Sequence, residues 1–215
     1  MAGERKGQRC REDVLNPQEL ENLVSGCSSL RDKFIIYCLA FGGLRVSEMV
    51  HLRRTWINLD EKTLTVPLKQ DCRCKDCNRV VKKTGKSKGG VWRPKTEHGH
   101  RTIRIHPVLS PIIEEFLASS DGLGLTRQRV WQRIKELKDN LPSGHRILHN
   151  IYPHCLRATC ATDLAHEKIS SPALQHTFGW SRLSSAEFYV RTGEQRAIKE
   201  LDEIYSKYDK NESRT

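Results

Sequence analysis

The sequence predicts an α+β fold that is mainly α: a helical domain that contains one small antiparallel sheet of three strands. Apolar residues recur at helical spacing in most segments before residue 53 and after residue 107. Between these two regions the pattern changes to short runs typical of strands, over residues 56–59, 63–66 and 101–105. A chain order of helices, then a sheet, then more helices is typical of the α+β class.

The N-terminal part is expected to form three helices. The motif Asn16-Pro17-Gln18-Glu19 supplies an N-cap, a proline at the first helical position and a glutamate at the third, which together mark a helix start. The next helix covers residues 30–41 and ends at Gly42-Gly43, a helix-stop signal. A third helix is expected over residues 46–52.

The three strands are separated by a turn and by a longer excursion. Residues 60–62 form the turn between the first two strands, and Pro107 ends the third. The segment 69–92 contains three cysteines and a stretch rich in lysine and glycine. This composition predicts a surface insertion between the second and third strands.

The C-terminal part is expected to be mostly helical. Thr126 is placed to cap one helix and Pro153 to open another. Further helices are expected over residues 108–118, 171–178, 183–190 and 194–208. Residues 15–208 are thus expected to form one domain, between a charged lead-in at residues 1–14 and a polar tail at residues 209–215.

The composition favours a polyanionic partner. Lys and Arg outnumber Asp and Glu by 37 to 26, which gives a formal net charge of +11 at pH 7. Each cation that contacts a phosphate releases condensed counterions, so such a surface suits nucleic acid. Charge alone also fits an ordinary basic protein.

The sequence indicates neither a membrane span nor a secretory signal. No apolar run approaches the roughly 20 residues that a bilayer requires, and the N-terminus lacks an apolar core. Five scattered cysteines are expected to be small buried thiols in a reducing compartment: Cys10, Cys27, Cys38, Cys155 and Cys160. The expected location is the cytoplasm, in association with the nucleoid.

Several ionisable residues could serve phosphate chemistry, although each alone has an ordinary structural explanation. Arg45 begins a helix just after a glycine pair, where a guanidinium and backbone N–H groups can face one anion. His154 and Arg157 share a helix face, which puts an imidazole beside a phosphate clamp. Lys95 precedes the third strand. Tyr189 ends a short helix, and its phenol needs neighbouring positive charge to attack as phenolate.

The ordered set of these residues resembles the tyrosine recombinase family, also known as the phage integrase or Xer-type family. An arginine after Gly-Leu and before Ser-Glu resembles its first box, and a later His-x-Leu-Arg resembles its second. The resembling segments are Phe41-Gly42-Gly43-Leu44-Arg45-Val46-Ser47-Glu48-Met49, Lys95-Thr96 with 99–103, Pro153-His154-Cys155-Leu156-Arg157-Ala158-Thr159, and 174–180 with Phe188-Tyr189-Val190. The resemblance covers about residues 15–205 and implies a catalytic domain over residues 15–208.

The resemblance implies an enzyme that cuts and rejoins double-stranded DNA through a 3′-phosphotyrosyl bond to Tyr189. It implies that Arg45 and Arg157 neutralise the phosphate oxygens and that Lys95 protonates the departing 5′ oxygen. His154 would assist proton transfers, Trp180 would donate a hydrogen bond to the phosphate, and Glu48 would support the site. No metal or other cofactor would be needed for catalysis. The active form would be a homo-oligomer, a tetramer on paired DNA sites, and the last helix would either reach a neighbouring protomer or pack on its own chain.

This chain departs from the family pattern at three points. Most members have histidine where this chain has Trp180, and an indole N–H can donate a hydrogen bond but cannot shuttle a proton. Ala158 replaces a frequent histidine of the second box. The family's separate helical DNA-binding domain has no counterpart before the first helix, which indicates a catalytic-domain fragment or a minimal recombinase.

Two other functions fit parts of the same pattern. A type IB topoisomerase uses similar chemistry on one duplex, and a non-catalytic DNA-binding protein would need only the basic surface. The complete set of Arg45, Lys95, His154, Arg157 and Tyr189 argues against a non-catalytic protein.

The cysteine cluster in the insertion suggests a structural zinc ion. Cys72, Cys74 and Cys77 are close enough in sequence to hold Zn²⁺ in a loop too small for its own core. The fourth ligand is open, with His98 or His100 as candidates. The alternative is three solvent-exposed thiols in a flexible loop.

Overall fold

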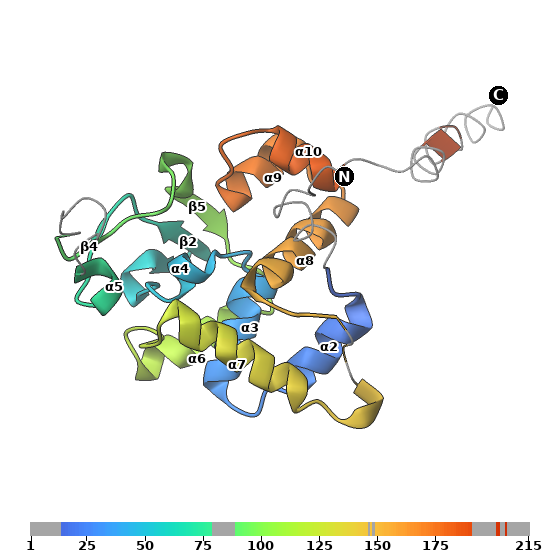
Figure 1. Ribbon diagram of the computed structural model, residues 1–215. Helices are drawn as coiled ribbons and strands as arrows, with labels where there is room; N and C mark the ends of the chain where they lie inside the picture. The colour runs from blue at the N-terminus through green and yellow to red at the C-terminus, as the bar shows by residue number, and fades with distance from the viewer. Residues whose placement is uncertain are drawn as a thin grey trace, which may run out of the picture.

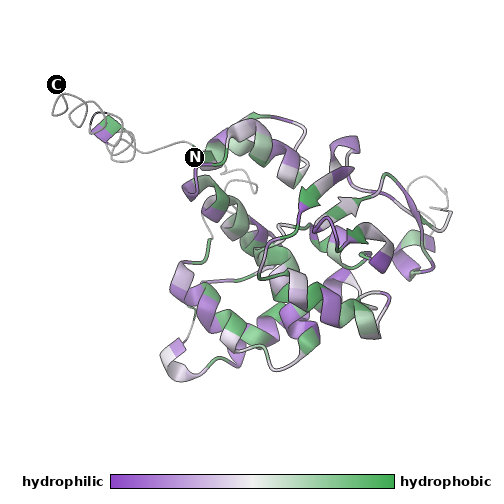
Figure 2. Cartoon of the chain, turned by 180° about the vertical axis from the view of Figure 1, so that it is seen from behind, coloured by the Kyte–Doolittle hydropathy of each residue, from purple (hydrophilic) through white to green (hydrophobic). Residues whose placement is uncertain are grey.

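The computed structural model describes residues 14–78, 89–145, 147, 149–190, 201, 202 and 205. A group of helices forms the body of the molecule, the strands lie to one side of it, and two short helices cover one end (Figure 1). Apolar segments concentrate where the helices meet, and polar segments lie on the outer turns (Figure 2). The prediction of a mainly helical α+β fold with a small antiparallel sheet is confirmed.

The first helices form as their sequence signals predict. α2 (Pro17–Ser25) begins with a capping box in which Asn16 accepts from the Glu19 N–H and the Glu19 side chain accepts from the Asn16 N–H. α3 (Leu30–Ala40) is apolar on nearly every side and lies at the centre of the body, against α8 and α6 (Figure 1). Phe34 of α3 stacks on Phe116 of α6 at 4.1 Å between ring centroids.

The third helix is shorter than predicted. α4 covers Val46–Met49 instead of residues 46–52. Beyond it, the N–H groups of His51 and Leu52 bond three residues back, to Glu48 and Met49, so the helix ends in a tighter turn. A short 3-10 helix, η1 (Arg54–Trp56), follows.

The main sheet has the strand order β1-β2-β5 and is antiparallel throughout. β1 covers Ile57–Asn58, β2 Thr63–Val66 and β5 Arg101–Arg104. The first strand is shorter than the predicted 56–59 because Trp56 belongs to η1, where its indole N–H donates to Gln70. In β5, Arg101 and Ile103 are buried and their neighbours are exposed.

The segment 69–92 is not only a surface insertion, so that prediction is wrong in part. Its described residues form a second, two-stranded sheet of β3 (Gln70–Asp71) and β4 (Val91–Trp92), with the short helix α5 (Lys75–Asn78) between them. Trp92 is buried against Trp56, with ring centroids 5.1 Å apart. This long-range contact draws the segment into the core.

The C-terminal helices confirm the predicted pattern. They are α6 (Ser110–Ser119), α7 (Arg127–Asp139), α8 (Pro153–His166), α9 (Ser171–Phe178) and α10 (Ser184–Val190), with 3-10 turns η2 (Glu97–Gly99) and η3 (Ser143–His145). Thr126 caps α7 as predicted, by accepting from the Arg129 N–H. α10 packs on both α9 and α8.

Some predicted features lie outside the described residues. These are residues 1–13 of the lead-in, the tail at 209–215, Cys10, and all of the predicted helix 194–208 except residues 201, 202 and 205. Among the described residues, no helix has the length and apolar character needed to cross a membrane. Cys27, Cys38, Cys155 and Cys160 are buried, as predicted.

Candidate active site

Six residues named from the sequence line one open cavity of about 440 Å³. They come from the start of α4, the loop after β4, α8, the second residue after the end of α9, and α10. The six are Arg45, Lys95, His154, Arg157, Trp180 and Tyr189. Both guanidinium groups therefore face the space in which an anion would bind.

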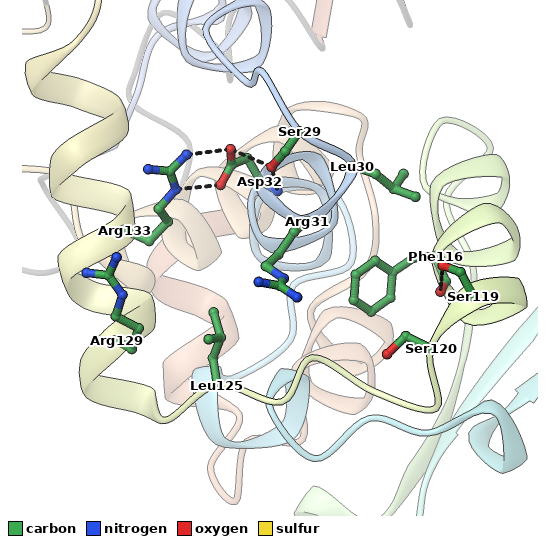
Figure 3. Close-up of a pocket in the computed structure, with 10 residues that line it drawn as sticks. All are labelled: Ser29, Leu30, Arg31, Asp32, Phe116, Ser119, Ser120, Leu125, Arg129 and Arg133. Carbon is green, nitrogen blue, oxygen red and sulfur yellow. Dashed lines mark hydrogen bonds and ion pairs between the residues drawn. The ribbon is translucent and has the colours of Figure 1, made fainter.

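A larger cavity of about 660 Å³ lies elsewhere, between α3, α6 and α7 (Figure 3). Its most prominent polar contact is a two-point ion pair in which Arg133 donates to Asp32 at 2.7 Å from each of two nitrogens. Its lining, within the part of the chain that the structure describes, contains no tyrosine, lysine or histidine. Its chemistry is that of a structural ion pair, so the smaller cavity is the better candidate for a reaction.

The buried carboxylate of Glu48 organises the arginines of the site. It is fully buried and accepts from Arg45 at 2.7 Å and from both terminal nitrogens of Arg101 at 3.0 Å. Burial alone would raise the pKa of Glu48, but the guanidinium groups of Arg101, Arg157 and Arg45 lower it to about 2. The carboxylate therefore stays ionised at any physiological pH.

Three arginines also bind three successive carbonyl groups at the end of α9. Arg101 donates to Thr177 at 2.7 Å, Arg157 donates to Phe178, and Arg45 donates to Gly179 at 2.7 Å. The last carbonyls of a helix have no partners within it and form the negative end of the helix dipole, so cations stabilise them. These bonds hold the end of α9, and the following Trp180, at the cavity wall.

Gly179 makes this close approach possible. Its φ of +56° is in the left-handed region, and an added Cβ would lie 2.6 Å from the carbonyl oxygen of His98. The end of α9 consequently contacts the backbone of η2, directly after the loop that carries Lys95.

Arg157 is held rigidly from α8. It is buried, donates to the Gly43 carbonyl and lies over the Phe178 ring at 4.8 Å. Burial lowers the pKa of Arg157 to about 9, so the group remains cationic at neutral pH. Arg45, by contrast, is partly exposed at the cavity, and its side chain uses two of its five N–H donors in bonds to other described residues.

His154 and Lys95 are the exposed members of the set. Partial desolvation, together with repulsion from Arg157, Lys95 and Arg45, lowers the pKa of His154 below 6.5. The imidazole is then neutral at pH 7 and can accept a proton. Lys95 lies in the loop after β4 and can approach the same space as a proton donor.

An aromatic stack positions the tyrosine. The ring of Tyr189 lies parallel to Trp180, with centroids 5.4 Å apart and an interplanar angle of 2°. Trp180 stacks in turn on Phe178 at 4.8 Å. The stack thus extends from the buried Phe178 through Trp180 to Tyr189, which lines the cavity.

Arg101 has no role predicted from the sequence, and the structure shows it to be the main partner of Glu48. One signal was available. Arg101 occupies the same face of its strand as Ile103, the inward face, and a charge buried there requires a partner.

The cysteine cluster has a fourth member, and it is neither histidine proposed from the sequence. The ligand atoms of His51, Cys72, Cys74 and Cys77 all lie within 4.8 Å of one another. His51 reaches the cluster from the turn after α4. His100 instead has its Nδ1 2.9 Å from the carbonyl of Val66.

Comparison with known proteins gives consistent matches. The Phage integrase family profile matches residues 13–196. Tyrosine recombinase XerD of Listeria innocua serovar 6a is 28% identical over 200 residues, covering 91% of this chain and 62% of the relative. XerD of Staphylococcus aureus is 26% identical, covering 90% and 62%. The chain therefore spans somewhat less than two thirds of the length of these curated relatives.

Solved structures share the fold. The Tn1549 transposon integrase in complex with transposon right end DNA has a TM-score of 0.68 at 18% identity, covering 89% of this chain and 66% of that one. XerA recombinase has a TM-score of 0.60 at 18% identity, covering 91% and 64%.

Proposed function

This chain belongs to the phage integrase family, and from that premise we propose that it is the catalytic domain of a tyrosine recombinase. Its reaction would be the cutting and rejoining of double-stranded DNA through a covalent bond to Tyr189. The observation that carries the proposal is the shared cavity, into which two arginines, a lysine, a histidine and a tyrosine converge from separate parts of the chain. We assign this domain to residues 15–208, with residues 69–92 as an insertion.

The proposed first step is an in-line displacement at one phosphorus atom. The phenol oxygen of Tyr189 forms a bond to phosphorus as the bond from phosphorus to the 5′ oxygen breaks, which leaves a 3′-phosphotyrosyl link. His154, neutral at pH 7, accepts the phenol proton, and Lys95 donates a proton to the departing 5′ oxygen. A 5′-hydroxyl then attacks the phosphotyrosine and reverses these bond changes, so neither ATP nor a metal takes part.

The two arginines stabilise the negative charge of the transition state. Arg45 and Arg157 neutralise the non-bridging oxygens as negative charge builds on them. Both are already held by backbone carbonyls, so little reorganisation is needed when the phosphate binds. Trp180 replaces the usual histidine as a hydrogen-bond donor only, which assigns proton transfer to His154 and Lys95.

The proposed partner is duplex DNA, bound by two or more copies of the protein. The net charge of +11 suits a polyanion, and a structural neighbour has been solved on transposon DNA. Pairing of two duplexes calls for a homo-oligomer, for which we propose a tetramer.

A covalent-capture experiment on randomised DNA tests whether Tyr189 is the nucleophile, whatever the target sequence is. The protein is mixed with a library of nicked duplexes of randomised sequence, and adducts that survive detergent are isolated and sequenced. A nick shortly to the 3′ side of the cleaved bond lets the short strand that carries the new 5′-hydroxyl diffuse away, so the adduct accumulates. We expect adducts with the native protein and none with Tyr189→Phe.

The matched control is Tyr37→Phe, since Tyr37 packs against Phe41 and does not line the cavity. Adducts of Tyr189→Phe at the native level would remove Tyr189 as the nucleophile. Relaxation of supercoiled DNA without strand exchange between duplexes would favour a type IB topoisomerase.

A further inference from the structure

We propose that His51, Cys72, Cys74 and Cys77 bind one zinc ion, and that this ion fixes the loop carrying Lys95 relative to the α4 end of the active site. The metal-binding half of this proposal rests on the geometry of the four ligand atoms alone. The positioning half rests on the function proposed above.

The distances within the cluster fit tetrahedral zinc. Zinc bonds of about 2.3 Å to sulfur and 2.0–2.1 Å to nitrogen place neighbouring ligands about 3.6–3.8 Å apart. His51 Nε2 lies 3.4 Å from Sγ of Cys74 and 3.4 Å from Sγ of Cys77. A small adjustment of the side chains would bring all four ligand atoms to the corners of a tetrahedron.

The ligands are already oriented. His51 Nδ1 lies 2.7 Å from the carbonyl of Ser47, so the proton is on Nδ1 and the lone pair of Nε2 faces the sulfurs. Two backbone N–H groups donate to sulfur at 3.4 Å: that of Cys74 to Cys72 and that of Cys77 to Cys74. Such bonds stabilise thiolates, which are the form that binds metal.

The described residues of the segment around the cluster form no separate core, because their buried side chains belong to the main core of the domain. β3 and β4 have two residues each and α5 has four. Cys72 and Cys77 are buried and Cys74 is exposed, so the alternative of three solvent-exposed thiols does not hold. An odd number of thiols cannot all pair as disulfides, and zinc would satisfy all three, releasing their protons to solvent.

The cluster joins two of the segments that supply the active site. On one side, His51 follows Glu48 by three residues in the turn after α4. On the other, β4 pairs with β3 directly before Cys72, and Lys95 follows Trp92 of β4 by three residues. Trp92 stacks on His51 at 5.3 Å, and Lys95 lines both the active-site cavity and the adjacent cavity lined by His51 and Cys77.

The position of the ion makes Lys95 its functional target. Glu48 and Arg45 are held by other buried groups, whereas Lys95 is exposed on the loop that follows β4. Loss of the ion would therefore disturb proton donation to the 5′ oxygen more than phosphate binding.

Metal content tests the first half. We expect one zinc per chain by mass spectrometry, and after replacement by Co²⁺ the absorption of a tetrahedral site with sulfur-to-metal charge transfer. His51→Ala should weaken zinc binding at least about tenfold in competition with a chelator, and His51→Cys should restore it. The matched control is His98→Ala, which removes an exposed histidine outside the cluster. Metal-free native protein, or unchanged affinity in His51→Ala, would overturn the zinc site.

A modified substrate tests the second half. Sulfur in place of the bridging 5′ oxygen leaves as a thiolate and needs no proton, so it bypasses Lys95. We expect His51→Ala and Lys95→Ala to lose adduct formation on the oxygen substrate and to regain most of it on the sulfur substrate. Equal loss on both substrates, or full activity of the metal-free protein on the oxygen substrate, would refute the positioning role.

The two proposals can fail separately. If the native protein forms no adduct with either substrate, the recombinase assignment fails, and the zinc measurement still decides the metal site. If adducts form and no zinc is bound, only the metal site fails.

Discussion

At the level of single residues, the carboxylate of Glu48 is the negative charge around which the positive groups of the cavity are arranged. It bonds to Arg45 and Arg101 directly, and its charge also acts on Arg157. Removing one partner of a buried ion pair leaves the other charge uncompensated, which costs about 3–5 kcal/mol.

Glu48→Gln should therefore lower the free energy of unfolding by about 3–5 kcal/mol at pH 7, measured by urea denaturation. Because the pKa of Glu48 falls from 4.5 to about 2 on folding, its contribution is complete above pH 4.5 and is lost as the pH falls towards 2. The difference between native and variant should shrink over that range. Glu61→Gln, at an exposed position, is the control and should change stability little at any pH.

His154 gives a second prediction, for the pH dependence of the reaction. Its pKa is lowered from 6.5, so the neutral base is present at pH 7 and is lost at a pH below 6.5. The rate of adduct formation should fall through that lower range. In His154→Ala the rate should be reduced and this pH step absent; a step that persists in the variant would assign the titration to another group.

At the level of elements, the end of α9 is the most constrained segment of the site. Gly179→Ala would put a Cβ 2.6 Å from the His98 carbonyl in a left-handed conformation, at a cost of about 1–3 kcal/mol for the backbone alone. We expect a lower unfolding temperature and loss of adduct formation. Gly144→Ala, where an added Cβ meets nothing within 4 Å, should retain both.

Elements with strong local signals could be predicted from the sequence, and those that depend on distant partners could not. The capping box of α2 and the Thr126 cap of α7 lie within a few residues of the helix that they start. β3 and β4 form because Trp92 packs on Trp56, a contact between residues far apart in sequence. His51 could not be predicted as a member of the cluster for the same reason, because it is far in sequence from the three cysteines that it meets.

At the level of the whole molecule, the candidate site could be predicted as an ordered set of motifs, but its internal support could not. Six of the residues that line the cavity could be named from the sequence because each lies in a recognisable segment. Arg101 is marked in the sequence only by its place on the inward face of its strand, and the structure identifies the partner that this place requires as Glu48.

DNA binding gives a prediction at this scale. The logarithm of the affinity for duplex DNA should fall linearly with the logarithm of salt concentration, and Lys95→Gln should reduce the slope by about one if Lys95 meets a phosphate. Fluorescence anisotropy measures both. Lys135→Gln is the matched control, because α7 lies at the opposite end of the molecule from α10 (Figure 1) and the slope should not change.

Three guanidinium groups, those of Arg45, Arg101 and Arg157, share one buried carboxylate, so the cations at the cavity and behind its wall repel one another. A bound phosphodiester supplies the missing negative charge and relieves this repulsion. Binding of DNA in the cavity should therefore stabilise the folded state as well as start the reaction. The melting temperature should rise when DNA is added. The protein would then be most stable while DNA is bound.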